Sequence, residues 1–160
     1  MILVLENIRS SHNVGSILRT ADAVGASEVY LCGVTPAPID RFGLPNTRLI
    51  KVSLGAETTV TWEHYISTKS AITLLAKQGF TLIALEQSDN AIEYTSQKLS
   101  RFSWEKSALI LGEEVHGLTS DILSRVDMHI EIPMYGTKES LNVAVACGIA
   151  LYRLKEIMEN

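Results

Sequence analysis

The sequence predicts an α/β domain with a mostly parallel sheet and helices on both faces, and two observations carry this prediction. An apolar run at Ile2–Leu5, an amphipathic stretch ending at Gly25 and a second apolar run at Glu28–Cys32 follow one another within about thirty residues. This is the order and length of a strand–helix–strand unit with parallel strands. The later run Phe80–Leu85 is apolar at nearly every position, which is typical of a strand covered on both faces.

The helix after the first strand is expected to extend to Val24. Asn13, or a serine just before it, is a suitable N-cap, because a side-chain oxygen there accepts hydrogen bonds from the free N–H groups of the first turn. Gly25 is well placed as the left-handed residue that ends the helix. Apolar residues fall on one face of this segment: Ile17, Leu18, Ala21 and Val24.

The segment Gly33–Gly55 is predicted to be a long irregular loop, because prolines and glycines recur throughout it. It is also the most basic stretch of the chain, with Arg41, Arg48 and Lys51. Long loops in compact domains are usually functional or mobile, but a basic stretch of this kind is also typical of a solvated surface. Both interpretations stay open, and the stretch 56–67 that follows is ambiguous.

The second half of the chain is expected to alternate helices and strands. The predicted elements are a helix over Thr68–Gln78 ended by Gly79, the strand Phe80–Leu85, a short helix over Ser96–Phe102, a strand at Ala108–Leu111, a short helix capped by Thr119 or Ser120 and ending at Arg125, and a strand at Met128–Ile132. Ligands bind outside the carboxyl ends of the strands in open parallel sheets. Three strand exits are therefore candidate sites: Leu85-Glu86, Gly112–Gly117 and Pro133–Ser140.

The last of these exits leads into the final helix. Pro133 stops the strand, since it lacks the N–H that a sheet needs, and a polar loop over Pro133–Glu139 follows. Ser140 is the expected N-cap of a helix from Leu141. That helix is apolar on every face except at Asn142, and it is therefore expected to be buried all round. The Asn142 amide must find partners there or cost roughly 1–3 kcal/mol.

The composition is that of one globular domain. The 160 residues are 46% hydrophobic and 20% charged, with a net charge of −4, which argues mildly against a polyanionic partner. No apolar run reaches the eighteen or so residues of a membrane span. The N-terminal residues lack the basic lead of a signal peptide, so a cytoplasmic protein without membrane contact is expected. Cys32 and Cys147 have no second ligand nearby and are predicted to be buried hydrophobes.

Two short motifs stand out, and each also has an ordinary explanation. In Asn13-x-Gly15-x-x-x-Arg19, a glycine in the first helical turn costs about 1 kcal/mol against alanine, which indicates a backbone or ligand close to it. A capped helix with an exposed arginine gives the same pattern. In Gly112-x-Glu114-x-x-Gly117 the glycines indicate a bent loop, although acidic residues after a strand are usually just solvated. No phosphate-binding glycine loop, hydrolase elbow or metal-ligand spacing is present in the sequence.

Three motifs gain specificity from their common order and spacing. They are Asn13-Val14-Gly15-x-x-x-Arg19-Thr20-Ala21, Leu111-Gly112-x-Glu114-x-x-Gly117-Leu118, and Ile132-Pro133-Met134 with Ser140-Leu141-Asn142. In this arrangement they resemble the motifs of the SPOUT class of methyltransferases, in its SpoU/TrmH branch. The resemblance covers nearly the whole chain as one domain, 1–160, and it is to the minimal form without an added RNA-binding domain.

This resemblance implies a fold, a cofactor and a reaction. Members of the class have a C-terminal trefoil knot, form homodimers and bind S-adenosylmethionine in the knot, and this branch methylates ribose 2′-hydroxyls of tRNA or rRNA. By similarity, the cofactor-binding residues are Leu85, Glu86, Gly112, Glu113, Ile132, Met134, Ser140 and Leu141. The active-site residues are, likewise, Asn13, Arg19, Glu114, Ser140 and Asn142. No metal is implied.

For the chemistry, we expect Arg19 to bind an RNA phosphate and to stabilise developing negative charge, because a guanidinium stays protonated in proteins. Glu114 is expected to orient Asn13 or Arg19 through hydrogen bonds. A net acidic chain is an awkward RNA binder. A homodimer is therefore expected to join the basic residues into one positive strip: Arg9, Arg19, Arg41, Arg48 and Lys51.

Two other functions remain open from the sequence. One is a non-catalytic knotted RNA-binding or assembly module, which would retain RNA without methylating it. The other is a flavodoxin-like nucleotide-binding domain, which would carry a flavin or a nucleotide. The sequence identifies neither the RNA nor the nucleotide that is modified.

Overall fold

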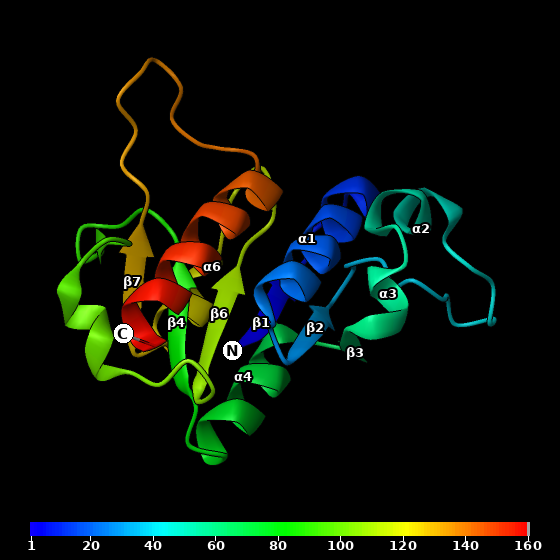
Figure 1. Cartoon of the computed structure of the whole chain (residues 1–160), viewed down its shortest axis with the longest axis horizontal. Coiled ribbons are helices and arrows are strands. Elements are labelled where there is room, and N and C mark those ends of the chain that lie inside the picture. Colours follow the sequence, from blue (N-terminus) through cyan, green and yellow to red (C-terminus); the bar gives the residue numbers. More distant parts are fainter. Residues whose placement is uncertain (160) are drawn as a thin grey trace.

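The computed structural model describes residues 1–159, which form a seven-stranded sheet in the order β3-β2-β1-β6-β4-β7-β5 (Figure 1). Every paired strand in this part of the chain runs parallel to its neighbour. The strands are β1 (Ile2–Glu6), β2 (Glu28–Cys32), β3 (Thr61–Tyr65), β4 (Thr81–Leu85), β5 (Ile92–Glu93), β6 (Ser107–Leu111) and β7 (Met128–Glu131). The predicted α/β class with a parallel sheet is confirmed.

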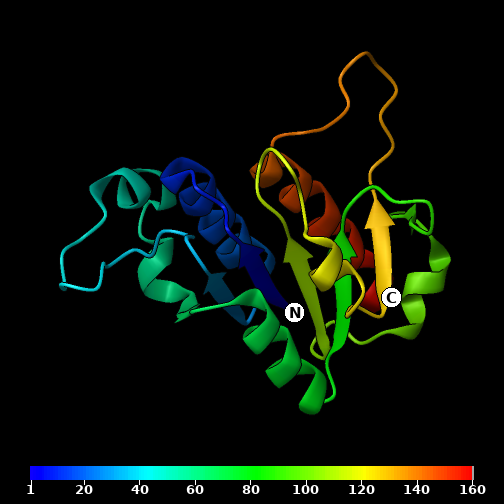
Figure 2. The same cartoon turned by 180° about the vertical axis from the view of Figure 1, so that it is seen from behind.

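Helices cover both faces of the sheet, because successive residues of a buried strand point to opposite sides. In β1, Leu3 and Leu5 belong to one hydrophobic core, while Ile2 and Val4 belong to the other. The first core is closed by α1 (Ser11–Val24), α2 (Thr47–Ser53), α3 (Ala56–Thr59), the 3-10 helix η1 (Gln97–Arg101) and α6 (Val143–Glu159). The second core is closed by α4 (Thr68–Lys77) and α5 (Ser120–Leu123), which lie in front of the sheet in Figure 2.

Helix α1 has the ends that its sequence predicts. Ser10 is the N-cap and its side chain accepts from the Asn13 N–H at 3.2 Å, so a serine before Asn13 begins the helix. Gly25 ends it in the left-handed conformation, with φ of 73°. A glycine at position 15 lowers helix stability, and the sequence therefore predicted a close neighbour there. That neighbour is α2, since a Cβ on Gly15 would lie 2.6 Å from the carbonyl oxygen of Leu49. The glycine therefore lets two helices pack backbone to backbone.

The segment Gly33–Gly55 is not irregular throughout, and this prediction was wrong over residues 47–53. Helix α2 forms there because the Asn46 side chain accepts from the Leu49 N–H and Leu49 is fully buried against α1. The ambiguous stretch 56–67 becomes α3 and β3. Strand β3 lies at one edge of the sheet and carries mostly exposed side chains, so it lacks the apolar run by which buried strands are recognised. The two-residue strand β5, at the other edge, was also missed.

Helix α6 differs from its prediction at its start and in its burial. It begins at Val143, not Leu141, because Asn142 caps it in place of Ser140: the Asn142 Oδ1 accepts from the Ala144 and Val145 N–H groups at 2.9 and 3.4 Å. Only one face is buried, while Val145, Ile149 and Tyr152 are exposed. The expectation of all-round burial was therefore wrong. Both cysteines are buried and free, as predicted, and within residues 1–159 no helix has the length and apolarity to span a membrane.

Candidate active site

The three predicted strand exits meet at one cavity of about 260 Å³. They do so because β6, β4 and β7 are adjacent in the sheet and parallel, so their carboxyl ends lie at the same edge. Every residue predicted to bind a cofactor lines this cavity: Leu85, Glu86, Gly112, Glu113, Ile132, Met134, Ser140 and Leu141. Glu114 lines it too. The sequence therefore located the cavity wall from residues that are far apart along the chain.

The loop after β6 folds back on itself, and its glycines make this possible. Glu113 and Gly117 form an antiparallel bridge, and a Cβ on Gly112 would overlap the Gly117 carbonyl group. Gly117 has a φ of +66° and lies against the Glu86 carboxylate. That carboxylate accepts from the Leu118 N–H at 2.8 Å. The residue that follows β4 thus holds the loop closed, and the two glycines stand where a Cβ would clash.

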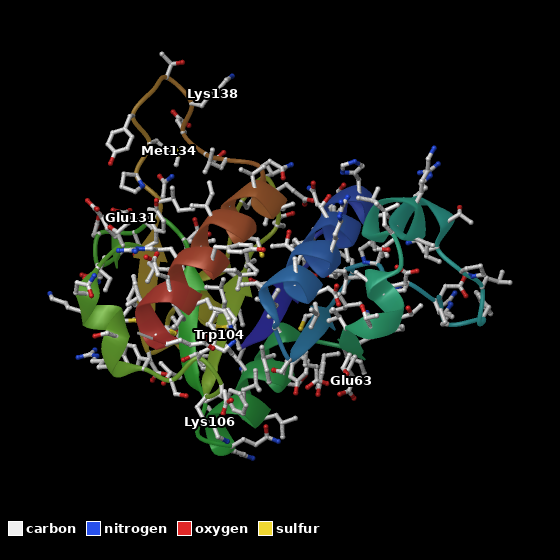
Figure 3. The ribbon with its side chains drawn as sticks, viewed as in Figure 1. Glu63, Trp104, Lys106, Glu131, Met134 and Lys138 are labelled. Atoms are coloured by element: carbon white, nitrogen blue, oxygen red, sulfur yellow. The ribbon has the colours of Figure 1, made fainter. Side chains whose placement is uncertain are left out.

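The loop between β7 and α6 projects from the strand ends (Figure 1). Figure 3 shows Met134 near its base and Lys138 near its outer end. The Gln87 side chain, from the exit of β4, donates to the Glu139 carbonyl oxygen at 2.8 Å. This hydrogen bond ties the far limb of the loop to the cavity rim, so the segment that carries Ser140 and Leu141 is positioned by tertiary contact.

A chain of side-chain hydrogen bonds joins the two ends of the protein beside the cavity. The Asn142 Nδ2 donates to the Asn13 Oδ1 at 3.1 Å, and the Asn13 Nδ2 donates to the Glu114 Oε1 at 2.9 Å. Because the Asn142 Oδ1 caps α6 at the same time, its amide orientation is fixed. Asn142 is exposed, so its predicted burial was wrong, but its amide is hydrogen-bonded all the same, and one partner lies 129 positions away.

Glu114 is the centre of this cluster. It accepts also from the backbone N–H groups of Arg9 and Ser10, each at 3.3 Å. Burial raises the pKa of Glu114, but the hydrogen bonds from Asn13 and from these two backbone groups outweigh it, so the pKa lies below its usual value of 4.5. Glu114 is therefore a carboxylate at neutral pH, and in the described chain it orients Asn13 and not Arg19.

The sequence was compared with known families and proteins. The SpoU rRNA Methylase family matches residues 1–152. The chain belongs to this family. Among curated proteins, the tRNA (guanosine(18)-2′-O)-methyltransferase of Escherichia coli K12 is 31% identical over the whole chain, which covers 65% of that protein. The 23S rRNA (guanosine-2′-O-)-methyltransferase RlmB of Neisseria meningitidis is 30% identical over the whole chain, covering 60% of that protein. The chain thus spans less than two thirds of these relatives.

Solved structures of related proteins have the same fold. An AdoMet-bound rRNA methyltransferase from Sinorhizobium meliloti is 27% identical, with a TM-score of 0.84 over 97% of this chain and 55% of that one. A structure concerned with 2′-OH methylation of C/U34 on tRNA is 28% identical, with a TM-score of 0.79. It matches 99% of this chain and 95% of its own.

Not all of the predicted SpoU site residues come together in one chain. Arg19 is exposed on α1 and is not among the residues that line the cavity. Arg41, Arg48 and Lys51 are exposed on the segment 41–51, the last two on α2. Arg9 instead pairs with Glu113, with Nε and Oε2 3.8 Å apart. These residues lie before α1, on α1 and on or just before α2, and the strip expected across a homodimer stays a prediction.

Four cavity residues lie outside the predicted exits and motifs: Gln87, Glu131, Val143 and Ala146. Gln87 directly follows a predicted exit, so its place in the sequence was a usable signal. Ala146 lies one helical turn after Asn142, and its role required the start of α6 to be known. Within residues 1–159, no group of three or more potential ligand side chains could hold a metal ion.

Proposed function

We propose that the protein transfers a methyl group from S-adenosylmethionine to a ribose 2′-hydroxyl of tRNA or rRNA. The observation that carries this proposal is the cavity at the exits of β4, β6 and β7, lined by the SpoU motif residues, with the Asn13–Glu114–Asn142 cluster at its side. Curated relatives that match the whole chain are named as 2′-O-methyltransferases of tRNA or rRNA.

The residues present suit this cofactor. Leu85, Ile132 and Leu141 add apolar surface to the cavity for a purine ring, and the carboxylates of Glu86, Glu113 and Glu114 suit a cationic sulfonium. Bound there, the cofactor would supply an electrophilic sulfonium methyl group. We propose that the C-terminal part of the chain is threaded as a trefoil knot around this cavity, as family membership implies.

The polar cluster would position the sugar. Asn142 uses its oxygen to cap α6 and one N–H for Asn13, so its second N–H is free to donate to a ribose oxygen. The exposed Ser140 hydroxyl lies on the same rim. Glu114, held ionised, fixes Asn13 and thereby Asn142. Methyl transfer requires such in-line placement of the hydroxyl and the methyl group.

Arg19 would come from a second copy of the chain. We propose a homodimer, supported by the apolar side chains that α6 leaves exposed, Val145, Ile149 and Tyr152. In that assembly Arg19 would bind the phosphate beside the target sugar and stabilise negative charge on the attacking oxygen. It would not act as the base, because a guanidinium remains cationic in proteins.

The segment 38–51 is the proposed RNA-binding surface. It carries Arg41, Arg48 and Lys51, and Phe42 is 73% exposed with the Arg41 guanidinium 4.8 Å from its ring centre. Exposed aromatic rings and guanidinium planes stack on unpaired bases. The loop is rigid at its tip, since the Asp40 Oδ1 accepts from the Phe42 and Leu44 N–H groups. An RNA-modifying role also places the protein, as a further proposal, in the cytoplasm.

The test is incubation with labelled S-adenosylmethionine and total tRNA or rRNA, followed by nucleoside mapping. The expected result is label in a ribose-methylated nucleoside, with label lost in Asn142→Ala. Retention of RNA without any label would support the non-catalytic RNA-binding module instead. Incorporation into a base rather than a ribose would overturn the proposed reaction.

A further inference from the structure

A second cavity, of about 300 Å³, lies on the other side of the glycine loop. It is lined by Glu6, Asn7, Arg9, Val34, Glu113, His116, Gly117 and Thr119. Three of these residues also line the first cavity: Glu113, His116 and Gly117. The second cavity is formed because β2, β1 and β6 are successive parallel strands, so that their carboxyl ends lie at the same edge of the sheet. The two cavities therefore share one wall.

The second cavity contains a buried acid that the proposed reaction does not use. Glu6, at the end of β1, is only 5% exposed. Its carboxylate accepts from the Thr119 N–H at 3.3 Å and from the Thr119 hydroxyl at 3.2 Å. Each carboxylate oxygen has a second lone pair, and an acceptor buried with unused capacity favours a ligand that brings N–H groups.

Donor groups surround this acceptor. The Asn7 Oδ1 accepts from the Val34 N–H at 3.2 Å, and this bond does not use the two N–H donors of the amide. Arg9 has a largely exposed side chain that reaches Glu113 only at 3.8 Å. Val34 is an exposed apolar side chain at the rim. The cavity thus combines an acceptor, flanking donors and an apolar surface, as the edge and face of a planar heterocycle require.

The cavity also adjoins the catalytic cluster. Arg9 contributes its side chain to the second cavity, while its backbone N–H donates to Glu114. Glu114 in turn holds Asn13, which holds Asn142. A nucleotide with its base in the second cavity and its sugar at this cluster would bridge the two cavities over their shared wall.

We propose that the second cavity binds the base of the nucleotide that is methylated, extruded from the RNA, and that Glu6 selects guanine there. Guanine presents two adjacent N–H donors, N1–H and N2–H, to one carboxylate, whereas adenine, cytosine and uracil do not. Proteins that recognise RNA by sequence mostly read unstacked bases that are splayed out of single-stranded loops. This inference rests on the proposed function, which does not itself assign the cavity or the base.

The test uses the whole chain, labelled with nitrogen-15, titrated with the 5′-monophosphates of guanosine, inosine, adenosine, cytidine and uridine. Guanosine monophosphate is expected to shift the amide signals of Asn7, Val34 and Thr119. Its affinity is expected to exceed that of inosine monophosphate, which lacks the 2-amino group, by about tenfold, the effect of one hydrogen bond to a charged acceptor.

Glu6→Gln is expected to remove this preference, so that the guanosine and inosine nucleotides bind within about twofold of each other. A glutamine oxygen still accepts from the Thr119 N–H, so the fold is kept. Glu63→Gln is the matched control, since Glu63 lies on β3 away from both cavities (Figure 3) and should leave the preference intact.

Signals that do not move at millimolar nucleotide, or that move only around the first cavity, would overturn the proposal. So would a guanine preference that survives in Glu6→Gln. Methylation of RNA by a chain whose second cavity binds no base would leave the proposed function standing and reject this site alone. Selective guanine binding without any methylation would support the base-binding site and reject the proposed function.

Discussion

The two cavities share the loop after β6, but the carboxylates of Glu114 in the first and Glu6 in the second differ in burial and in hydrogen bonding. On the first side, exposed Glu114 accepts from Asn13 and from two backbone N–H groups, and its pKa is lowered. On the second side, the one hydrogen-bond partner that buried Glu6 has within residues 1–159 is Thr119, and burial raises its pKa more than those hydrogen bonds lower it. Glu114 thus uses three of its roughly four acceptor sites to hold other groups, whereas Glu6 uses two and has more capacity left for a ligand.

Arg19 lines neither cavity of a single chain. Its replacement by alanine therefore tests whether the reaction needs a group that neither cavity supplies. Arg19→Ala is expected to lower turnover by about 10²–10³-fold, the effect of losing a charge-stabilising donor. Cofactor affinity, measured by calorimetry, should stay nearly unchanged, and Arg101→Ala on η1 is the control. Loss of cofactor binding in Arg19→Ala would refute this division of roles.

Gly112→Ala should damage both cavities at once, because the new Cβ would overlap the Gly117 carbonyl group in their shared wall. We expect a loss of about 1–3 kcal/mol in the free energy of unfolding and weaker binding of both cofactor and nucleotide. The control is Gly136→Ala, since a Cβ there meets nothing within 4 Å. A Gly112→Ala protein that lost only one ligand would show that the wall is not common to the two sites.

Two substitutions of Asn142 separate its effect on stability from its effect on methyl transfer. Asn142→Ala removes both the helix cap and the donor to Asn13, and should lower stability by about 1 kcal/mol as well as activity. Asn142→Asp keeps an acceptor for the Ala144 and Val145 N–H groups but cannot donate. We expect it to unfold like the unmodified chain in denaturant while losing methyl transfer. Full activity in Asn142→Asp would contradict the positioning role.

Arg41 and Arg48 line neither cavity, so they test RNA affinity apart from nucleotide selection. Reversing both to glutamate should weaken RNA binding and reduce the slope of log affinity against log salt by about 2, one for each lost phosphate contact. Fluorescence anisotropy across a salt series measures this, with Lys77→Glu on α4 as a control. Affinity that is unchanged at every salt concentration would exclude this segment from the interface.

The pH dependence of stability should have opposite signs for the two acids. The pKa of Glu114 is lowered on folding, so its stabilising contribution is present above about pH 4.5 and is lost as the pH falls through the folded pKa. The pKa of Glu6 is raised, so its contribution is present at low pH and is lost as the pH rises through the folded pKa.

Urea unfolding between pH 3.5 and 7 can measure this difference. Against the unmodified chain, Glu114→Gln should become relatively less stable as the pH rises, and Glu6→Gln relatively more stable. The Glu114 effect should be small, about 0.5 kcal/mol, because solvent screens an exposed group. If both variants change in the same direction, the contrast between the two cavities is wrong.

Much of the fold could be predicted because its signals are local. The apolar run of β1, the left-handed Gly25 after α1 and the apolar β6 each need only a few neighbouring residues to be recognised. Helix α2 was missed, and the stretch that holds the edge strand β3 stayed ambiguous, for the converse reason. Leu49 stabilises α2 only by packing on α1 beside Gly15, and β3 pairs with β2 without a buried run of its own.

The sequence by itself determined the parallel α/β sheet, the walls of the first cavity and the motif residues of the SpoU family. These features can be recognised from short runs of residues and from the spacing between them. Only the tertiary structure decided that Asn13 and Asn142 are hydrogen-bonded, that Asn142 caps α6, and that Glu6 lies in a second cavity. These contacts join residues that lie far apart in the chain. They exist only because β1 pairs with β6 and α1 packs on α6, and a linear pattern does not encode such pairings.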